Sequence, residues 1–129
     1  MTNIQPSLGQ IAITISEIDR VLPFYRDILG LNFLFSPAPT IAFLASGDVR
    51  IMLTTPQGHG EVGKNSPLYF YVQSLETCFA KMVEMGAQSE RAPALVAPMP
   101  RHDLWMGFIR DPDGNLIGLM EEKPRDNRI

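Results

Sequence analysis

Few residues of this 129-residue chain combine side-chain types and spacing that could do chemistry. Two stretches each place a histidine beside a carboxylate: His59 is two residues from Glu61, and His102 adjoins Asp103. Imidazole and carboxylate groups can bind a divalent metal ion or act in acid–base catalysis. Both pairs fall in glycine-rich or proline-rich stretches that are expected to be loops, so we interpret them as solvated polar residues.

Two tyrosines stand two residues apart in the stretch PLYFYV, residues 67–72. Successive side chains of a strand point to opposite faces, so Tyr69 and Tyr71 share one face and the apolar residues between and beside them share the other. The apolar face suits burial beneath a helix, and the tyrosines then line a wall where their hydroxyls can find partners. These tyrosines and His102 are also candidates for metal-independent acid–base chemistry, although their spacing alone does not establish it.

The same alternation groups residues of other candidate strands into one ligand-binding wall. Its predicted members are Gln10, Thr14, Arg50, Met52, Thr54, Tyr69, Tyr71, Trp105, Phe108, Gly118 and Met120. An apolar and aromatic wall with a few separated hydrogen-bonding groups is typical of a small-molecule pocket. The alternative is a face filled by its own tyrosine and methionine side chains, because methionine fills irregular gaps readily.

Two features of this wall are left open by the pattern. Arg50 either points toward the wall, where an anionic ligand or an acidic neighbour would be needed, or stays solvated at the start of its strand. Trp105 and Phe108 have opposite parity in one strand, so only one of them should face the wall.

The elements that must position these residues occur twice along the chain. Residues 10–31 and 67–87 each give a short β-rich run, a polar step, an apolar helical stripe and a glycine. Pro23 lies past the first turn of the first helix and should remove a hydrogen bond and bend it. Three further strands are predicted after each helix, at about 32–36, 41–46 and 49–55, and at about 89–92, 104–110 and 115–121. Residues 92–103 contain three prolines and are predicted to form an irregular loop.

The repeated unit is therefore βαβββ, which predicts an α+β fold. The two modules are expected at about 8–56 and 66–123, followed by a charged tail at 124–129. Each has about 55 residues, too few to bury a good core alone. We expect them to pair within a single domain, 1–129, as one curved, mostly antiparallel sheet around a cup, with the helices on its outer face.

Composition excludes several classes of function. The net charge is −3 and there is no basic stripe, so a nucleic-acid partner is not expected. No window approaches the roughly 18 apolar residues of a membrane span, and the beginning of the chain has no signal-like segment, so a cytoplasmic protein is expected. The single cysteine, Cys78, cannot form an intrachain disulfide and falls on an apolar helical stripe.

Three motifs in order resemble one known superfamily. They are QIAITI at residues 10–15, FYRDILGL at 24–31 and RDPDGNLI at 110–117. Together with the duplicated βαβββ frame they resemble the vicinal oxygen chelate superfamily, which includes glyoxalases, bleomycin resistance proteins and extradiol dioxygenases. The resemblance covers about residues 8–123. It implies a cup-shaped sheet around one pocket, usually completed by dimerisation, so a homodimer is expected.

The resemblance also implies where a metal ion would bind. Metal-dependent members place four ligands at positions that correspond to Gln10, Met52, Pro67 and Gly118. Only Gln10 has a side-chain oxygen here, and the thioether of Met52 suits hard divalent metals poorly. We therefore expect no metal ion and no other cofactor. Gly118 lies mid-strand, and the missing side chain is expected to widen the pocket.

The function favoured by the sequence is metal-free binding of a small molecule, with sequestration of a drug or metabolite as one form of it. The first alternative is a lyase, isomerase or dioxygenase of the same superfamily, although such chemistry relies on a metal ion as Lewis acid. The second alternative is a non-catalytic dimer with a vestigial pocket.

Overall fold

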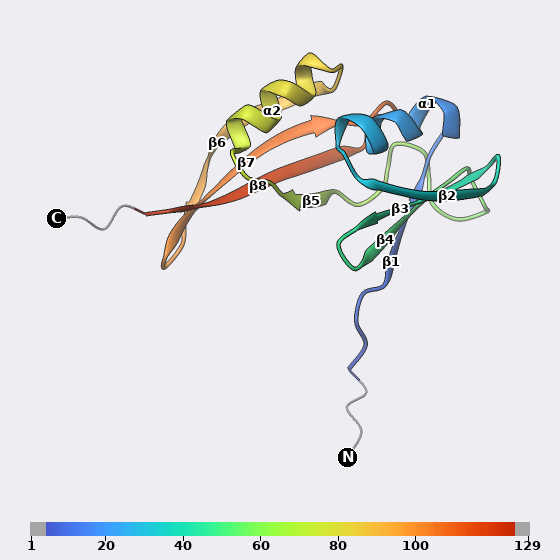
Figure 1. Ribbon diagram of the computed structural model, residues 1–129, viewed down its shortest axis with the longest axis horizontal. Coiled ribbons are helices and arrows are strands. Elements are labelled where there is room, and N and C mark those ends of the chain that lie inside the picture. The colour runs from blue at the N-terminus through green and yellow to red at the C-terminus, as the bar shows by residue number, and fades with distance from the viewer. Residues whose placement is uncertain (1–4, 126–129) are drawn as a thin grey trace. The chain divides into compact units, whose positions relative to one another are not determined.

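The computed structural model describes residues 5–125 and repeats the order strand, helix, three strands (Figure 1). The first half contains β1 (Gln10–Thr14), α1 (Ile18–Pro23), η1 (Phe24–Ile28), β2 (Asn32–Ala38), β3 (Ile41–Ser46) and β4 (Val49–Thr54). The second contains β5 (Leu68–Tyr71), α2 (Leu75–Glu84), β6 (Gln88–Pro98), β7 (His102–Arg110) and β8 (Leu116–Pro124). The α+β class with two βαβββ modules is confirmed.

The chain divides into two compact units at residues 63 and 64, and each unit has its own four-stranded sheet. The strand orders are β1-β4-β3-β2 and β5-β8-β7-β6. In each sheet the first strand runs parallel to its neighbour and the other pairs are antiparallel, so each sheet is mostly antiparallel, as predicted. The single domain over 1–129 remains a prediction.

In the first unit the core lies between the sheet and the helical segment. Ile13, Ile51 and Leu53 are buried on the face where Val21 and Tyr25 are also buried. The helical segment changes character after Pro23: α1 ends there and η1 continues as a π-helix, in which the amide of Leu29 donates to the carbonyl of Phe24 at 2.8 Å. Proline lacks an amide hydrogen, so this break is the predicted effect of Pro23.

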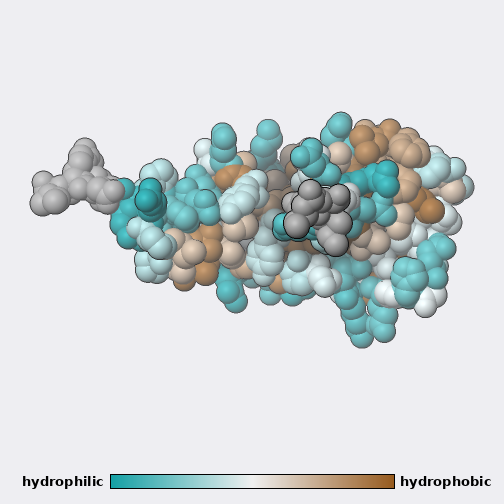
Figure 2. Space-filling model, turned by 90° about the horizontal axis from the view of Figure 1, so that it is seen from below, coloured by the Kyte–Doolittle hydropathy of each residue, from teal (hydrophilic) through white to brown (hydrophobic). Residues whose placement is uncertain are grey.

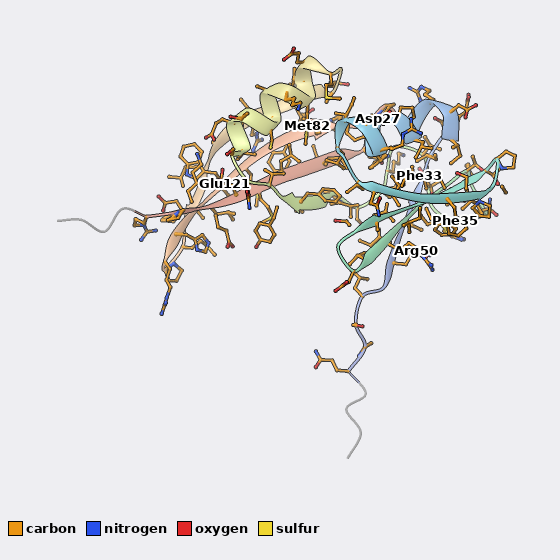
Figure 3. All side chains as sticks on the ribbon, in the orientation of Figure 1. Asp27, Phe33, Phe35, Arg50, Met82 and Glu121 are labelled. Atoms are coloured by element: carbon orange, nitrogen blue, oxygen red, sulfur yellow. The ribbon has the colours of Figure 1, made fainter. Side chains whose placement is uncertain are left out.

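In the second unit α2 packs on one face of the sheet through Leu75, Phe79 and Met82. Its N-cap residue, Ser74, has a φ of 56° and makes no side-chain capping bond. A carboxylate replaces that cap, since Glu121 from β8 accepts a hydrogen bond from the amide of Leu75 at 2.9 Å. Figure 3 shows Glu121 beside the start of α2. Strand β8 therefore fixes where the helix begins.

The predicted loop at 92–103 is wrong, because β6 extends through Pro98 and only three residues separate it from β7. The prolines are tolerated because β6 is an edge strand, which needs hydrogen bonds on one side only. The register also shifts between Arg91 and Ala94, around Pro93. A bulge of this kind removes the need for a regular ladder at the proline.

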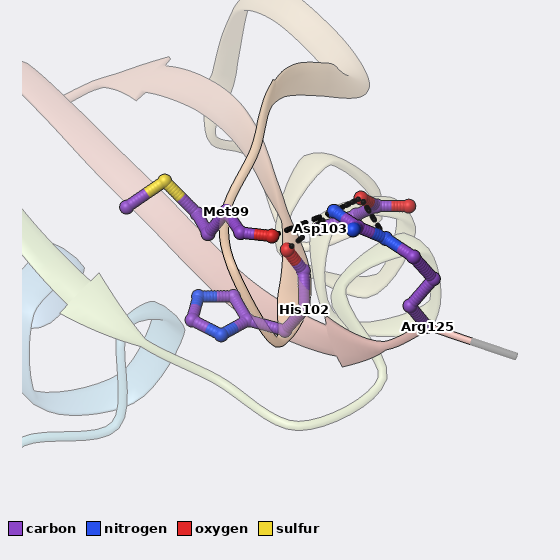
Figure 4. A network of polar contacts seen from close by, with 4 residues as sticks. All are labelled: Met99, His102, Asp103 and Arg125. Carbon is purple, nitrogen blue, oxygen red and sulfur yellow. Dashed lines mark hydrogen bonds and ion pairs between the residues drawn. The ribbon is translucent and has the colours of Figure 1, made fainter. Parts of the chain in front are cut away.

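The short turn between β6 and β7 is held by the side chain of the residue that follows β8 (Figure 4). The guanidinium of Arg125 donates to the carbonyls of Met99 and His102 at 2.7 and 3.2 Å and to the carboxylate of Asp103 at 2.8 Å. These contacts fix the end of the sheet that carries His102. The expected tail at 124–129 lies largely outside the described residues, and Pro124 closes β8.

The turn DPDGN between β7 and β8 is organised by one buried carboxylate. Asp111, 2% exposed, accepts hydrogen bonds from the amides of Asp113 and Asn115 at 2.9 and 2.8 Å, and from Nδ2 of Asn115 at 2.8 Å. The Asn115 side-chain oxygen then accepts from Nδ2 of Asn65 at 2.9 Å, just before β5. Gly114 has a φ of 90°, which a side chain would disfavour. Within residues 5–125, none of the helices is long and apolar enough to cross a membrane.

We predict that Asp111→Ala lowers the free energy of unfolding by about 2–4 kcal/mol, because it leaves buried donors without an acceptor. Urea unfolding of the full chain measures the change. Asp48→Ala, in the exposed turn between β3 and β4, is the matched control and should change stability by less than about 0.5 kcal/mol. Equal losses in the two variants would contradict the structural role given to Asp111.

Candidate functional site

The face of the first sheet opposite its helical segment carries a polar and aromatic group. Nε of Arg50 donates to Oε1 of Gln10 at 2.6 Å, and the guanidinium carbon lies 5.0 Å from the centre of the Phe43 ring. The Phe43 ring lies 5.1 Å from that of Phe35. Register places Met52 directly beside Phe43. Arg50 therefore lies along this open face with an amide partner and an aromatic ring, and Figure 3 shows it on β4.

Thr14 and Thr54 belong to the same face by register but are only 5% and 2% exposed. The hydroxyl of Thr54 donates to the carbonyl of Thr55 at 2.9 Å. The loop at Gly60 packs against Thr14 so closely that a side chain at Gly60 would collide with it. This end of the face is closed, and the two threonines are out of reach of solvent.

The open face of the second sheet brings together five of the predicted wall residues. Tyr69 pairs with Gly118, which pairs with Phe108, and Tyr71 pairs with Met120. Tyr69 and Tyr71 are 50% and 68% exposed, so their rings form the surface here.

Trp105 belongs to the opposite face of the second sheet. It pairs with Glu121 and lies beneath the ammonium of Lys123, which is 4.3 Å from the ring centre. Lys123 in turn contacts Glu76 of α2 at 2.6 Å. Trp105 and Phe108 thus lie on opposite faces of the second sheet, as their opposite parity predicts, and Phe108 lies on the side of the tyrosines.

Gly118 has no side chain because the ring of Tyr69 occupies that space. A Cβ built at Gly118 would lie 2.5 Å from Cδ2 and 2.8 Å from Cε2 of Tyr69. The ring also meets Phe108 edge to face, with centroids 6.0 Å apart and planes at 84°. The expectation that Gly118 widens the pocket is therefore wrong, because the missing side chain seats an aromatic ring against the sheet.

Beside this ring lies an open pocket of about 190 Å³. It is lined by Tyr69, Glu90, Arg91, Phe108, Arg110 and Leu116. Sequence reasoning found the two aromatic residues and missed the charged ones. Arg110 could have been found, since it has the parity of Phe108. Arg91 lies in the predicted strand at 89–92, but the register shifts between Ser89 and Arg91, so alternation does not assign its face.

The charges around the pocket are unevenly paired. Nε of Arg110 donates to Oε1 of Glu90 at 2.8 Å, and its Nη1 donates to the carbonyl of Gly114 at 2.7 Å. The hydrogen bond and charge of Arg110, with a smaller contribution from the charge of Arg91, lower the pKa of Glu90. The guanidinium carbon of Arg91 lies 5.8 Å from the centre of the Phe108 ring.

A second polar group lies farther along the same face. The hydroxyl of Tyr71 donates to Oε2 of Glu122 at 3.1 Å. Nε2 of His102 lies 3.3 Å from the same oxygen but outside hydrogen-bond geometry, and this nitrogen is buried. The carboxylate thus stands between a phenol and an imidazole, which are two groups able to exchange protons with a bound molecule.

Comparison with known proteins identifies the family of the chain. A sequence model of the Glyoxalase/Bleomycin resistance protein/Dioxygenase superfamily matches residues 7–119. The chain belongs to this superfamily. No curated protein sequence matches it.

Several solved structures share the superfamily fold with this chain. An integron cassette protein from the mobile metagenome of V. cholerae is 22% identical with a TM-score of 0.76, covering 94% of this chain and 98% of its own. TnmS3, an antibiotic binding protein from Streptomyces sp. CB03234, is 19% identical with a TM-score of 0.74, covering 95% and 100%. A lactoylglutathione lyase from Agrobacterium tumefaciens is 21% identical with a TM-score of 0.72, covering 91% and 94%. At these identities the similarity shows the fold.

The positions that bind metal in the glyoxalase-type resemblance do not fit a divalent cation here. In the first unit the only oxygen, Oε1 of Gln10, accepts from the positively charged Arg50, and Nε2 of Gln10 lies 3.9 Å from the sulfur of Met52. In the second unit Pro67 has no donor and Gly118 is covered by the Tyr69 ring. Within residues 5–125, no three His, Cys, Asp or Glu side chains lie close enough to share a metal ion.

We predict that Gly118→Ala displaces the Tyr69 ring without unfolding the protein, because the ring is half exposed and can swing outward. Aromatic NMR signals of Tyr69 and Phe108 should shift, and the free energy of unfolding should fall by about 1 kcal/mol. Gly9→Ala, where a Cβ meets no atom within 4 Å, is the control. Unchanged ring signals in Gly118→Ala would contradict the contact.

We predict that Glu122→Gln lowers the pKa of Tyr71. The hydrogen bond to Glu122, followed by the negative charge of that carboxylate, raises the pKa of Tyr71 above its ordinary value. The phenol form is favoured in the folded state, so its contribution to stability is present below the ordinary pKa of about 10 and is lost as pH rises through the raised value. Ultraviolet titration of phenolate absorbance measures the shift.

In that titration Tyr71→Phe identifies the Tyr71 signal, and Glu84→Gln on α2 serves as the matched control. A phenolate titration that is identical in the wild type and Glu122→Gln would show that the two groups do not interact in solution.

Proposed function

We propose that this chain binds a small organic molecule on the open face of its second sheet, without a metal ion. The observation that carries the proposal is the seating of Tyr69 on Gly118. The space where a side chain at position 118 could bind a metal ion is filled by the ring of Tyr69. That ring, Phe108 and Leu116 form an apolar wall, and the charged side chains of Glu90, Arg91 and Arg110 line the same pocket. An apolar wall with polar groups that fix orientation is typical of a small-molecule site.

TnmS3, which shares the fold of this chain, is described as an antibiotic binding protein. Sequestration of a drug or metabolite is the role that needs only the surface described above. It needs no proton transfer and no metal ligand, and the donor chemistry at Gln10 and Met52 agrees with that requirement.

We propose that the chain acts as a homodimer in the cytoplasm. Hydrophobic residues reach the surface in several places (Figure 2). On β2, Phe33, Leu34 and Phe35 are 38%, 43% and 50% exposed, and a second copy is the partner expected to cover them. The free Cys78 is compatible with a reducing compartment.

A superfamily enzyme is the second candidate, and one observation favours it. Tyr71, Glu122 and His102 form a cluster of groups that could move a proton to or from a bound molecule. Lactoylglutathione lyase shares this fold. If the wild type chemically changes a bound compound and Glu122→Gln does not, catalysis would be favoured over sequestration.

We predict that compounds which bind this chain do so equally well with a chelator present. Thermal-shift screening of a small-molecule library in EDTA should give hits, and a ligand at 100 times its Kd should add about 2.7 kcal/mol of stability. Phe108→Leu should weaken the hits about tenfold, because it removes an aromatic wall of the pocket. Phe33→Leu is the control, since Phe33 belongs to the first unit, where it pairs with the buried Leu44, and does not line the pocket.

Affinity that disappears in EDTA and returns with added zinc or manganese would contradict metal-free binding. An absence of hits across a broad library would favour the non-catalytic dimer with a vestigial pocket.

A further inference from the structure

The residues that line the pocket beside Tyr69 include one more positive charge than negative charge. Arg110 is matched by Glu90 and by the carbonyl of Gly114. Among the described residues, the side chain of Arg91 makes no hydrogen bond and no ion pair within 4.0 Å, and its contact is with the Phe108 ring. Two arginines and one glutamate leave a net charge of about +1 around the pocket.

The geometry of the pocket limits the shape of a ligand. Its volume is about 190 Å³, and a cavity of about 150 Å³ is known to hold a benzene molecule. Tyr69 and Phe108 meet edge to face, so a third ring can pack against their exposed surfaces. The pocket therefore suits a single aromatic ring with one small substituent.

Arg91 supplies the excess positive charge and also lies against the aromatic wall. Its guanidinium stands beside the aromatic wall with its donors uncommitted, and a planar guanidinium matches a carboxylate through two parallel hydrogen bonds. We infer that the ligand class of this site is a monocyclic aromatic carboxylate, with its ring against Tyr69 and Phe108 and its carboxylate on Arg91. This inference rests on the proposed function and names the class of molecule that the open face binds.

The test is a titration of the full chain with four probes at constant ionic strength: benzoate, benzamide, benzylamine and acetate. Chemical-shift changes in two-dimensional NMR give each Kd. Benzoate should bind at least about tenfold more tightly than the other three, because it alone offers both a ring and a carboxylate. Its binding should shift signals of Tyr69, Phe108 and Arg91.

The matched variants are Arg91→Gln and Arg101→Gln, which remove the same charge inside and outside the pocket. Arg91→Gln should raise the Kd of benzoate about tenfold and leave that of benzamide unchanged, whereas Arg101→Gln should change neither. If Arg91→Gln fails to fold, the ranking of the four probes on the wild type decides the inference alone.

Benzamide or benzylamine binding as tightly as benzoate at the same residues would overturn the carboxylate inference and leave small-molecule binding intact. Unchanged benzoate affinity in Arg91→Gln would do the same. Absence of benzoate binding overturns the inference as well, and the library screen then decides separately whether the face binds any small molecule.

Discussion

The buried carboxylate of Asp111 is the constraint on which the arrangement of the second sheet depends. The hydrogen bonds that it accepts from Asp113 and Asn115 set the turn between β7 and β8, and Asn115 extends the network to Asn65 just before β5. Three strands are thereby held in one register. A slip of one residue would turn Tyr69 from the open face to the helix face, because strand side chains alternate.

The open face follows from that register and from one missing side chain. With Gly118 opposite Tyr69, the ring lies down on the sheet and meets Phe108, and the pocket forms beside them. Any larger residue at Gly118 would push the ring into solvent. In the first sheet the ligand position Gln10 is also occupied, because its side-chain oxygen accepts a hydrogen bond from Arg50. In both sheets, a position expected to bind a metal ion therefore makes a contact within its own sheet instead.

The features that could be predicted from the sequence are those that depend on the local alternation and spacing of residues. The βαβββ repeat and the shared face of Tyr69 and Tyr71 follow from the period of a strand or helix, and the break at Pro23 follows from its missing amide hydrogen. The burial of Thr14 was not predictable, because it depends on a loop packing from more than 40 residues away.

Arg91 was missed for a different reason. It lies in the predicted strand at 89–92, but the register of β6 against β7 shifts on both sides of it, between Ser89 and Arg91 and between Arg91 and Ala94. Strand alternation therefore does not give the face of its side chain. Likewise, Glu121 caps α2 from 46 residues away, and a sequence pattern carries no signal for such a partner.

The edge strands have a consequence for how the chain resists fibril formation through the edges of its sheets. β2 and β6 each close one side of a sheet, and each contains proline and irregular register. On β6, Leu95 and Val96 are 50% and 54% exposed in a strand long enough to nucleate cross-β growth. Pro93 and Pro98 withhold the amide donors that an incoming chain would need to extend a fibril ladder.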